Sequence, residues 1–170
     1  AHRAARLLLF SARLWLDVVG RIDLAEKVLR EATQRAPSGS ASEHRALADL
    51  GRLYETSNND RAAAEVYERS LNTVLDEEAR AHEHARLAEL FENLGRFDKA
   101  ADHGRQAVAL RPTDVGARTR LDRLLRRLGA NRERVGLWSS LEDVDVSNGD
   151  KIAGLRRAAR ILEGELGKRE

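Results

Sequence analysis

The stretch Leu87–Pro112, LAELFENLGRFDKAADHGRQAVALRP, contains the spacing of residue sizes that decides the fold. Its first apolar residues recur every three or four positions, which is the period of one face of an α-helix; they are Leu87, Leu90, Phe91 and Leu94. The stripe stops at Gly95, a residue that readily adopts the left-handed conformation in which many helices end. It resumes at Phe97 and stops again at Pro112, which cannot continue a helix. The stretch therefore predicts two helices joined by a tight turn.

The same hairpin pattern occurs at other places in the 170-residue chain. Residues that tolerate a left-handed turn follow one another at intervals of 38, 37 and 34 residues, namely Gly20, Asn58, Gly95 and Gly129. A small residue stands five positions after each of the first three turns, at Ala25, Ala63 and Ala100. Periods of this length are typical of stacked helical arrays.

In the second and third units the pattern resembles the tetratricopeptide repeat. The second unit has Leu50, Gly51, Tyr54, Ala63 and Tyr67. The third has Leu87, Ala88, Phe91, Gly95, Ala100, Ala107 and Pro112. The first unit fits in its second half, and the fourth is degenerate because Arg134 stands where a small residue belongs.

This resemblance implies an all-α fold, a right-handed α-solenoid of stacked antiparallel helix hairpins. We expect a single array over residues 1–170, with units at 6–39, 40–76, 77–113 and 114–148 and a half unit at 149–170. The half unit is a lone final helix, expected over about Asp150 to Leu166. A single hairpin cannot bury both of its apolar faces, so neighbouring units must stack.

The sizes of individual residues predict how the helices pack. Small residues are expected where two helices cross closely, with large ones filling the groove between them. Trp138 falls at a large core position, whereas Gly104 replaces the usual bulky residue of the third unit. At Gly104 we expect either a locally thin core or an intruding side chain from a neighbouring unit.

Three polar residues predict where helices begin. Ser40 and Glu43 have the spacing of a capping box, in which each side chain satisfies a free backbone N–H. Asp76 and Asp150 are predicted to be N-caps of later helices.

Composition restricts the origin and the compartment of the chain. It has neither Cys nor Met, so we expect an internal part of a longer array, of a kind common in bacterial adaptors. The most apolar run, RLLLFSARLWLDVV, contains Arg13 and Asp17 and is too short to span a membrane. A cytoplasmic location is favoured, and a periplasmic one stays open because a leader could have preceded residue 1.

Catalytic and metal-binding motifs are absent from the sequence. It has no glycine-rich phosphate loop, no G-x-S-x-G elbow and no H-E-x-x-H motif. Glu78 and His82 are four residues apart and could share a metal, but two ligands make a poor site. We therefore expect no enzyme, no catalytic residue, no cofactor and no bound metal.

Charge changes sign along the chain. Residues 1–114 have 17 basic and 19 acidic side chains, whereas residues 115–170 have 13 basic and 9 acidic. The basic excess is concentrated in RTRLDRLLRRLG, which has five arginines, from Arg118 to Arg127, and a single acidic residue, Asp122. This helix is either a solvated face or a groove for an acidic segment, because arginine binds carboxylates in a bidentate manner.

In the resembled family, the first helix of each hairpin lines the concave surface of the array. Carried over position by position, the predicted partner-binding residues are Arg45, Arg52, Glu89, Glu92, Arg120, Arg123, Arg126, Arg127, Arg156 and Arg160. We expect a protein-interaction scaffold or adaptor that binds a peptide, a helix or another protein there, with an acidic or mixed-charge segment favoured.

Two alternatives stay open. One is the binding of nucleic acid or another polyanion by the arginine-rich fourth and fifth units, which is disfavoured because no aromatic residues interleave with the basic ones. The other is a docking platform for a folded regulatory partner such as a small GTPase.

Overall fold

The computed structural model describes residues 2–73 and 76–166, and every regular element in these residues is helical. The helices are α1 (His2–Leu14, continued by the π-helical turn η1, Trp15–Val19), α2 (Ile22–Arg35), α3 (Ala41–Thr56), α4 (Asp60–Ser70), α5 (Glu77–Asn93), α6 (Phe97–Leu110), α7 (Val115–Arg127), α8 (Asn131–Ser139, followed by the 3₁₀ turn η2, Ser140–Asp143) and α9 (Asn148–Leu166).

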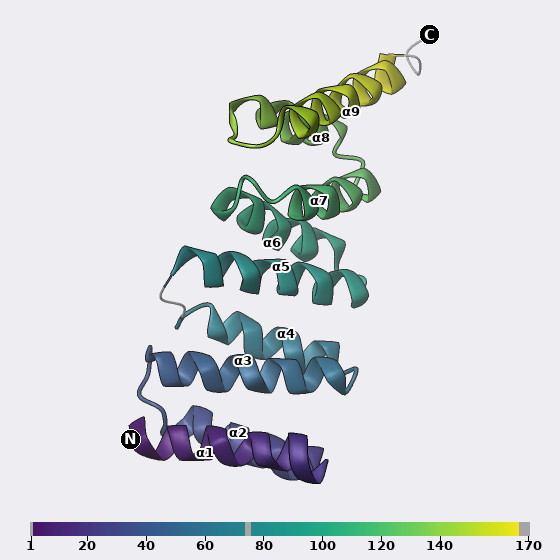
Figure 1. Cartoon of the computed structure of the whole chain (residues 1–170). Helices are drawn as coiled ribbons and strands as arrows, with labels where there is room; N and C mark the ends of the chain where they lie inside the picture. The colour runs from purple at the N-terminus through teal and green to yellow at the C-terminus, as the bar shows by residue number, and fades with distance from the viewer. Residues whose placement is uncertain (1, 74–75, 167–170) are drawn as a thin grey trace.

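The helices pair into hairpins that stack in chain order. α1 packs on α2, α3 on α4, and α5 on α6, and each second helix packs on the first helix of the next pair. α8 packs on both α7 and α9. Figure 1 shows the pairs stacked one above another, with the two ends of the chain at opposite ends of the array. The predicted all-α solenoid is confirmed, whereas the unit limits stay a prediction.

The turns have the predicted backbone conformation. Gly20, Gly95 and Gly129 have φ angles of 69°, 72° and 71°. Asn58 has a φ of 54° and is the one non-glycine residue with positive φ in the described ranges. Asn is one of the few other residues that adopt this conformation readily, which explains how it replaces glycine in the series.

Close helix crossings occur where the sequence has glycine. A Cβ atom on Gly51 of α3 would lie 2.7 Å from Cζ of Tyr67 on α4, so only glycine allows these helices to pack with the ring between them. At Gly104 of α6 a Cβ atom would lie 3.2 Å from Cδ1 of Leu121 on α7. The second alternative at Gly104, an intruding side chain from the next unit, is therefore confirmed.

Helix starts follow the capping predictions with one exception. Ser40 accepts a hydrogen bond from the N–H of Glu43, whose carboxylate in turn accepts one from the N–H of Gly39. Asp76 caps α5 by accepting a hydrogen bond from the N–H of Ala79.

The prediction for Asp150 was wrong, because α9 begins two residues earlier, at Asn148. The Ser147 hydroxyl accepts a hydrogen bond from the N–H of Asp150 and donates one to its carboxylate. Asp150 is therefore the acidic partner of a capping pair rather than the cap itself.

The fourth hairpin replaces two small packing residues with an ion pair. Asp122 stands seven residues before its turn, where the earlier units have Gly51 and Ala88, and Arg134 stands five after it. The Arg134 guanidinium donates a hydrogen bond of 2.7 Å to the Asp122 carboxylate, and both side chains are nearly buried. The two departures from the repeat pattern thus compensate each other across the α7–α8 crossing.

The apolar core divides near this ion pair. A large cluster extends from Leu9 to Leu125, and a second, smaller one contains Trp138, Leu141 and Ala158. The predicted core position of Trp138 is confirmed, since its side chain is 2% exposed. None of the helices in the described part of the chain is both long enough and apolar enough to cross a membrane.

Candidate interaction surface

Ion pairs connect the first helices of successive hairpins into one surface, which we call the first-helix face (α1, α3, α5 and α7). Arg13 of α1 lies 3.9 Å from Asp49 of α3. Glu55 of α3 pairs with Arg86 of α5. Since neighbouring first helices are joined through long side chains, the charges on this face are paired along the array.

The α5–α7 junction has two such pairs. Glu89 accepts from Arg120, and Glu92 accepts a hydrogen bond of 2.7 Å from Arg123. The two glutamates are three residues apart on α5, and the two arginines are three apart on α7. Four of the predicted partner-binding residues are therefore engaged with one another within the chain.

Arg52 is also engaged, with Asp49 of its own helix at 2.6 Å. It borders a hollow of about 360 Å³ between α1, α2 and α3 that has an apolar floor including Ala12, Leu16 and Leu53. Arg45 is exposed on α3. Arg52 thus lies beside this hollow, and Arg45 is seven residues earlier on the same helix of the first-helix face.

The five arginines of the basic helix α7 have different environments. Arg118 is 3% exposed and donates hydrogen bonds to backbone oxygens of Pro112 and Leu137, and burial lowers the pKa of its guanidinium. Arg127 lies over the ring of Phe97 on α6, 3.9 Å from its centre. Arg118 is therefore structural, contrary to its expected place in a solvated or binding cluster. Among the other four, only Arg126 has neither a carboxylate nor a ring partner in the described residues.

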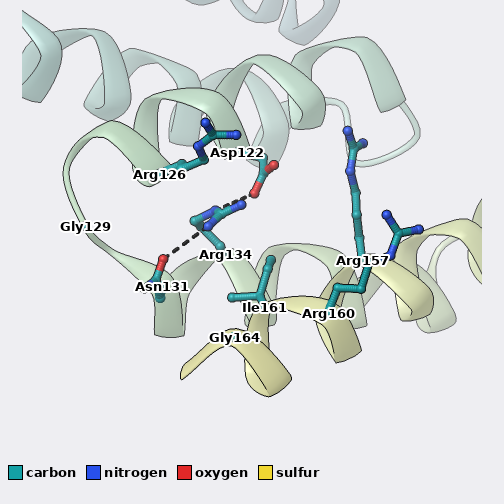
Figure 2. Close-up of a pocket in the computed structure, with 9 residues that line it drawn as sticks. All are labelled: Asp122, Arg126, Gly129, Asn131, Arg134, Arg157, Arg160, Ile161 and Gly164. Carbon is teal, nitrogen blue, oxygen red and sulfur yellow. Dashed lines mark hydrogen bonds and ion pairs between the residues drawn. The ribbon is translucent and has the colours of Figure 1, made fainter. Parts of the chain in front are cut away.

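A groove of about 600 Å³ lies between α7, the start of α8 and α9. We call it the α7–α9 groove; its lining residues are Asp122, Arg126, Gly129, Asn131, Arg134, Arg157, Arg160, Ile161 and Gly164. Figure 2 shows Arg126 of α7 on one side of the Asp122–Arg134 pair and Arg157 and Arg160 of α9 on the other. Arg156, also predicted, is exposed on α9 but does not line the groove. The structure thus brings together Arg126 and Arg160 of the predicted set and adds Arg157.

A buried polar network lies between the second and third hairpins. The hydroxyl of Ser70 lies 3.0 Å from Nδ1 of His44 and donates a hydrogen bond of 3.3 Å to the carboxylate of Glu83. Glu83 is 4% exposed, and burial raises the pKa of its carboxyl group to about 7. Burial also lowers the pKa of His44.

The sequence analysis missed this network, because its members are 13 and 26 residues apart and belong to no known motif. The only available signal was position: Glu83 precedes the turn residue Gly95 by twelve, where the second unit has Ala46. Ser70 is fully buried, so the hydroxyl has no access to a substrate, and the network has a structural role.

Two histidines form a second polar contact between α5 and α6. Nδ1 of His84 and Nδ1 of His103 are 3.0 Å apart, and the His103 ring stacks on Phe91. Burial lowers the pKa of both, that of His84 to about 4. The contact therefore requires at least one neutral ring.

The suggested Glu78 and His82 pair has no further ligands. Both side chains are exposed, and Glu78 lies 3.9 Å from Arg111. Across residues 2–73 and 76–166, no three or more side chains of the metal-binding types come together.

The hairpin stacking and the paired first-helix face define the class of protein, an α-solenoid built from helix–turn–helix repeats. Residues 46–81 match the family model of the tetratricopeptide repeat. This match lies on the second unit, and the hairpins on either side of it have the same helix–turn–helix arrangement.

Several solved structures superpose on almost the whole chain at low sequence identity and show that they share its fold. A tetratricopeptide-repeat protein from Parabacteroides merdae is 17% identical with a TM-score of 0.70, over 95% of this chain and 61% of its own. MamA is 16% identical with a TM-score of 0.60, over 96% of this chain and 81% of its own. YrrB, a tetratricopeptide-repeat protein described as having an unusual peptide-binding site, is 17% identical with a TM-score of 0.61. The match covers 92% of this chain and 76% of YrrB. No curated protein sequence matches the chain.

Proposed function

We propose that this chain is a non-catalytic scaffold that binds a segment of another protein on its first-helix face. The observation that supports the proposal is the continuous row of charged side chains on α1, α3, α5 and α7, which is joined across three junctions by ion pairs. Such a row can exchange its internal partners for those of a ligand while the apolar core stays intact. The peptide-binding site named for YrrB gives a precedent in the same fold.

Site-specific photo-cross-linking tests the proposal, with one cross-linking residue in each of two variants. The first variant has it at Arg45, exposed on α3 of the first-helix face. The matched variant has it at Arg61, exposed on the second helix α4. Each variant is mixed with lysate of the native organism, irradiated, and the attached segments are identified by mass spectrometry.

We expect cross-links to a protein segment from position 45 and none from position 61. The reverse pattern would show that partners bind elsewhere on the array. Attachment of several distant segments of one folded domain, rather than one short segment, would favour the alternative of a folded regulatory partner such as a small GTPase.

Binding of nucleic acid or another polyanion is the second candidate, favoured by the exposed arginines of α7 and α9. Arg126, Arg156 and Arg160 have no ion-pair partner in the described residues. If these three contacted duplex phosphates, log affinity would fall with log salt at a slope of roughly −2.7. A labelled duplex that does not bind even at low salt would eliminate this candidate.

A further inference from the structure

The charge pattern of the first helices changes at the last junction. Between α1 and α3, α3 and α5, and α5 and α7, an arginine of one first helix pairs with a carboxylate of the neighbouring first helix. No ion pair joins α7 to α9 in the described part of the chain. The α7–α9 groove lies at this junction.

Both walls of this groove contribute cations. Arg126 comes from α7, and Arg157 and Arg160 come from α9 (Figure 2). Among the described lining residues Asp122 is the single carboxylate, and it already accepts a hydrogen bond of 2.7 Å from Arg134. Like charges repel across a gap of this kind, and an anion placed between the walls would remove the repulsion.

One wall of the groove is held in place by packing. The guanidinium of Arg157 lies over the ring of Trp138, 4.6 Å from its centre, and Trp138 is buried in the small C-terminal core. An arginine positioned in this way loses little freedom when it binds an anion. Ile161 and Gly164 add apolar lining beside the cations.

We propose that the α7–α9 groove binds an acidic helical segment of a partner protein, with two carboxylates three residues apart. The chain itself provides the model for this ligand. Glu89 and Glu92 are three residues apart on α5 and pair with Arg120 and Arg123 of α7. Arg123 and Arg126, and likewise Arg157 and Arg160, repeat the three-residue spacing. Residues three apart on a helix project from one face, so one turn of an acidic helix presents both carboxylates to the groove.

This proposal rests on the proposed function and adds to it the place and the chemistry of the partner. A protein carboxylate is favoured over a phosphate because the groove combines arginines with apolar lining. The described lining also has no aromatic ring on which a base could stack.

The test uses a fluorescein-labelled helical peptide with a glutamate at every third position, and a matched peptide with glutamine instead. Fluorescence anisotropy measures binding of both to the chain and to R126Q/R160Q. The double variant R3Q/R6Q changes two exposed arginines of α1 and is the control for lost charge. Neither substituted groove arginine has a partner in the described residues, so circular dichroism and thermal unfolding should be unchanged.

We expect the glutamate peptide to bind the unaltered chain and R3Q/R6Q equally, and R126Q/R160Q about tenfold more weakly, since each exposed contact contributes a modest amount. The glutamine peptide should not bind. Equal binding by R126Q/R160Q, or no binding of the glutamate peptide to any form, would overturn the proposal.

Three further outcomes show which of the two proposals fails. If R45Q/R52Q loses the peptide while R126Q/R160Q keeps it, the ligand lies on the first-helix face, and only the groove proposal fails. If a labelled oligonucleotide binds more tightly than the peptide and depends on the same two arginines, the groove is a phosphate site, and the acidic-segment proposal is wrong. If no cross-link forms at position 45 but the glutamate peptide still binds, the proposal of binding on the first-helix face fails and the groove proposal stands.

Discussion

The buried Glu83 carboxyl group makes a specific prediction about stability and pH. Its pKa is about 7 in the fold and 4.5 in an unfolded chain, because burial disfavours the charged form. Between these two pH values the native state holds a proton that the unfolded state has lost. Stability therefore falls as pH rises from 4.5 to 7 and is constant above that range.

The magnitude follows from the two pKa values. One pKa unit corresponds to about 1.4 kcal/mol, so ionisation of Glu83 removes about 3 kcal/mol of unfolding free energy by pH 7. His84 has the opposite effect, because its pKa is lowered from 6.5 to about 4 in the fold. The unfolded state then binds the extra proton, and stability rises with pH between 4 and 6.5. His44 and His103, whose pKa values burial also lowers, act in the same direction as His84. These rising contributions overlap the falling one of Glu83, so the profile of the unaltered chain is expected to be shallow.

The variant E83Q separates the two contributions. Urea unfolding followed by circular dichroism gives its unfolding free energy, and that of the unaltered chain, across this pH range. The unfolding free energy of E83Q minus that of the unaltered chain should increase by about 3 kcal/mol between pH 4.5 and 7. The unfolding free energy of E83Q itself should rise with pH, because the histidine contribution then acts without that of Glu83. E78Q, which changes an exposed glutamate of the same helix, is the control for a lost carboxylate. A difference between E83Q and the unaltered chain that does not vary with pH would refute the reasoning.

Two further predictions concern the helix crossings, and both are measured by urea unfolding. G51A should destabilise the array by about 1–3 kcal/mol, because the new methyl group would overlap the Tyr67 ring. The control G136A should be neutral or stabilising, because a Cβ atom there meets nothing within 4 Å. Equal changes in unfolding free energy for the two variants would contradict the packing argument. R134A should cost about 3 kcal/mol because it leaves Asp122 nearly buried without its cation, whereas D122A/R134A, which restores two small residues, should cost clearly less. If the double variant is as unstable as R134A, the ion pair is not what replaces small-residue packing here.

The features predictable from the sequence were those set by neighbouring residues or by the repeat period. Gly20 and Asn58 share a backbone conformation because each ends a helix at the same place in its unit. Gly51 and Tyr67 follow from size alone, since a close crossing needs a small residue opposite a large one. These rules act within one hairpin, so a single chain displays them several times.

Contacts between hairpins were not predictable in the same way. The charges of Glu92 and Arg123 are visible in the sequence, but their pairing across 31 residues depends on the stagger of successive hairpins. Arg118 looked like its neighbours in the basic helix, yet its position eleven residues before the turn directs it into the core, where the second unit has Leu47. A count of arginines therefore overestimates how many are free to bind a partner.

The departures from the repeat pattern also change how the last helices are held. In the second and third units, small and large apolar residues join the two helices of a hairpin, as at Gly51 and Tyr67. In the fourth, Asp122 and Arg134 take the place of small residues, and Arg118 binds the backbone near the end of α8.

The apolar core is divided at this place: Leu137 of α8 packs against the large cluster, whereas Trp138 and Ala158 belong to the small cluster that joins α8 to α9. Salt screens exposed charges strongly but a nearly buried pair such as Asp122–Arg134 only slightly. Hydrogen exchange in α8 should therefore change little with ionic strength in the unaltered chain and increase in R134A, and a large increase with salt in the unaltered chain would contradict this view of the ion pair.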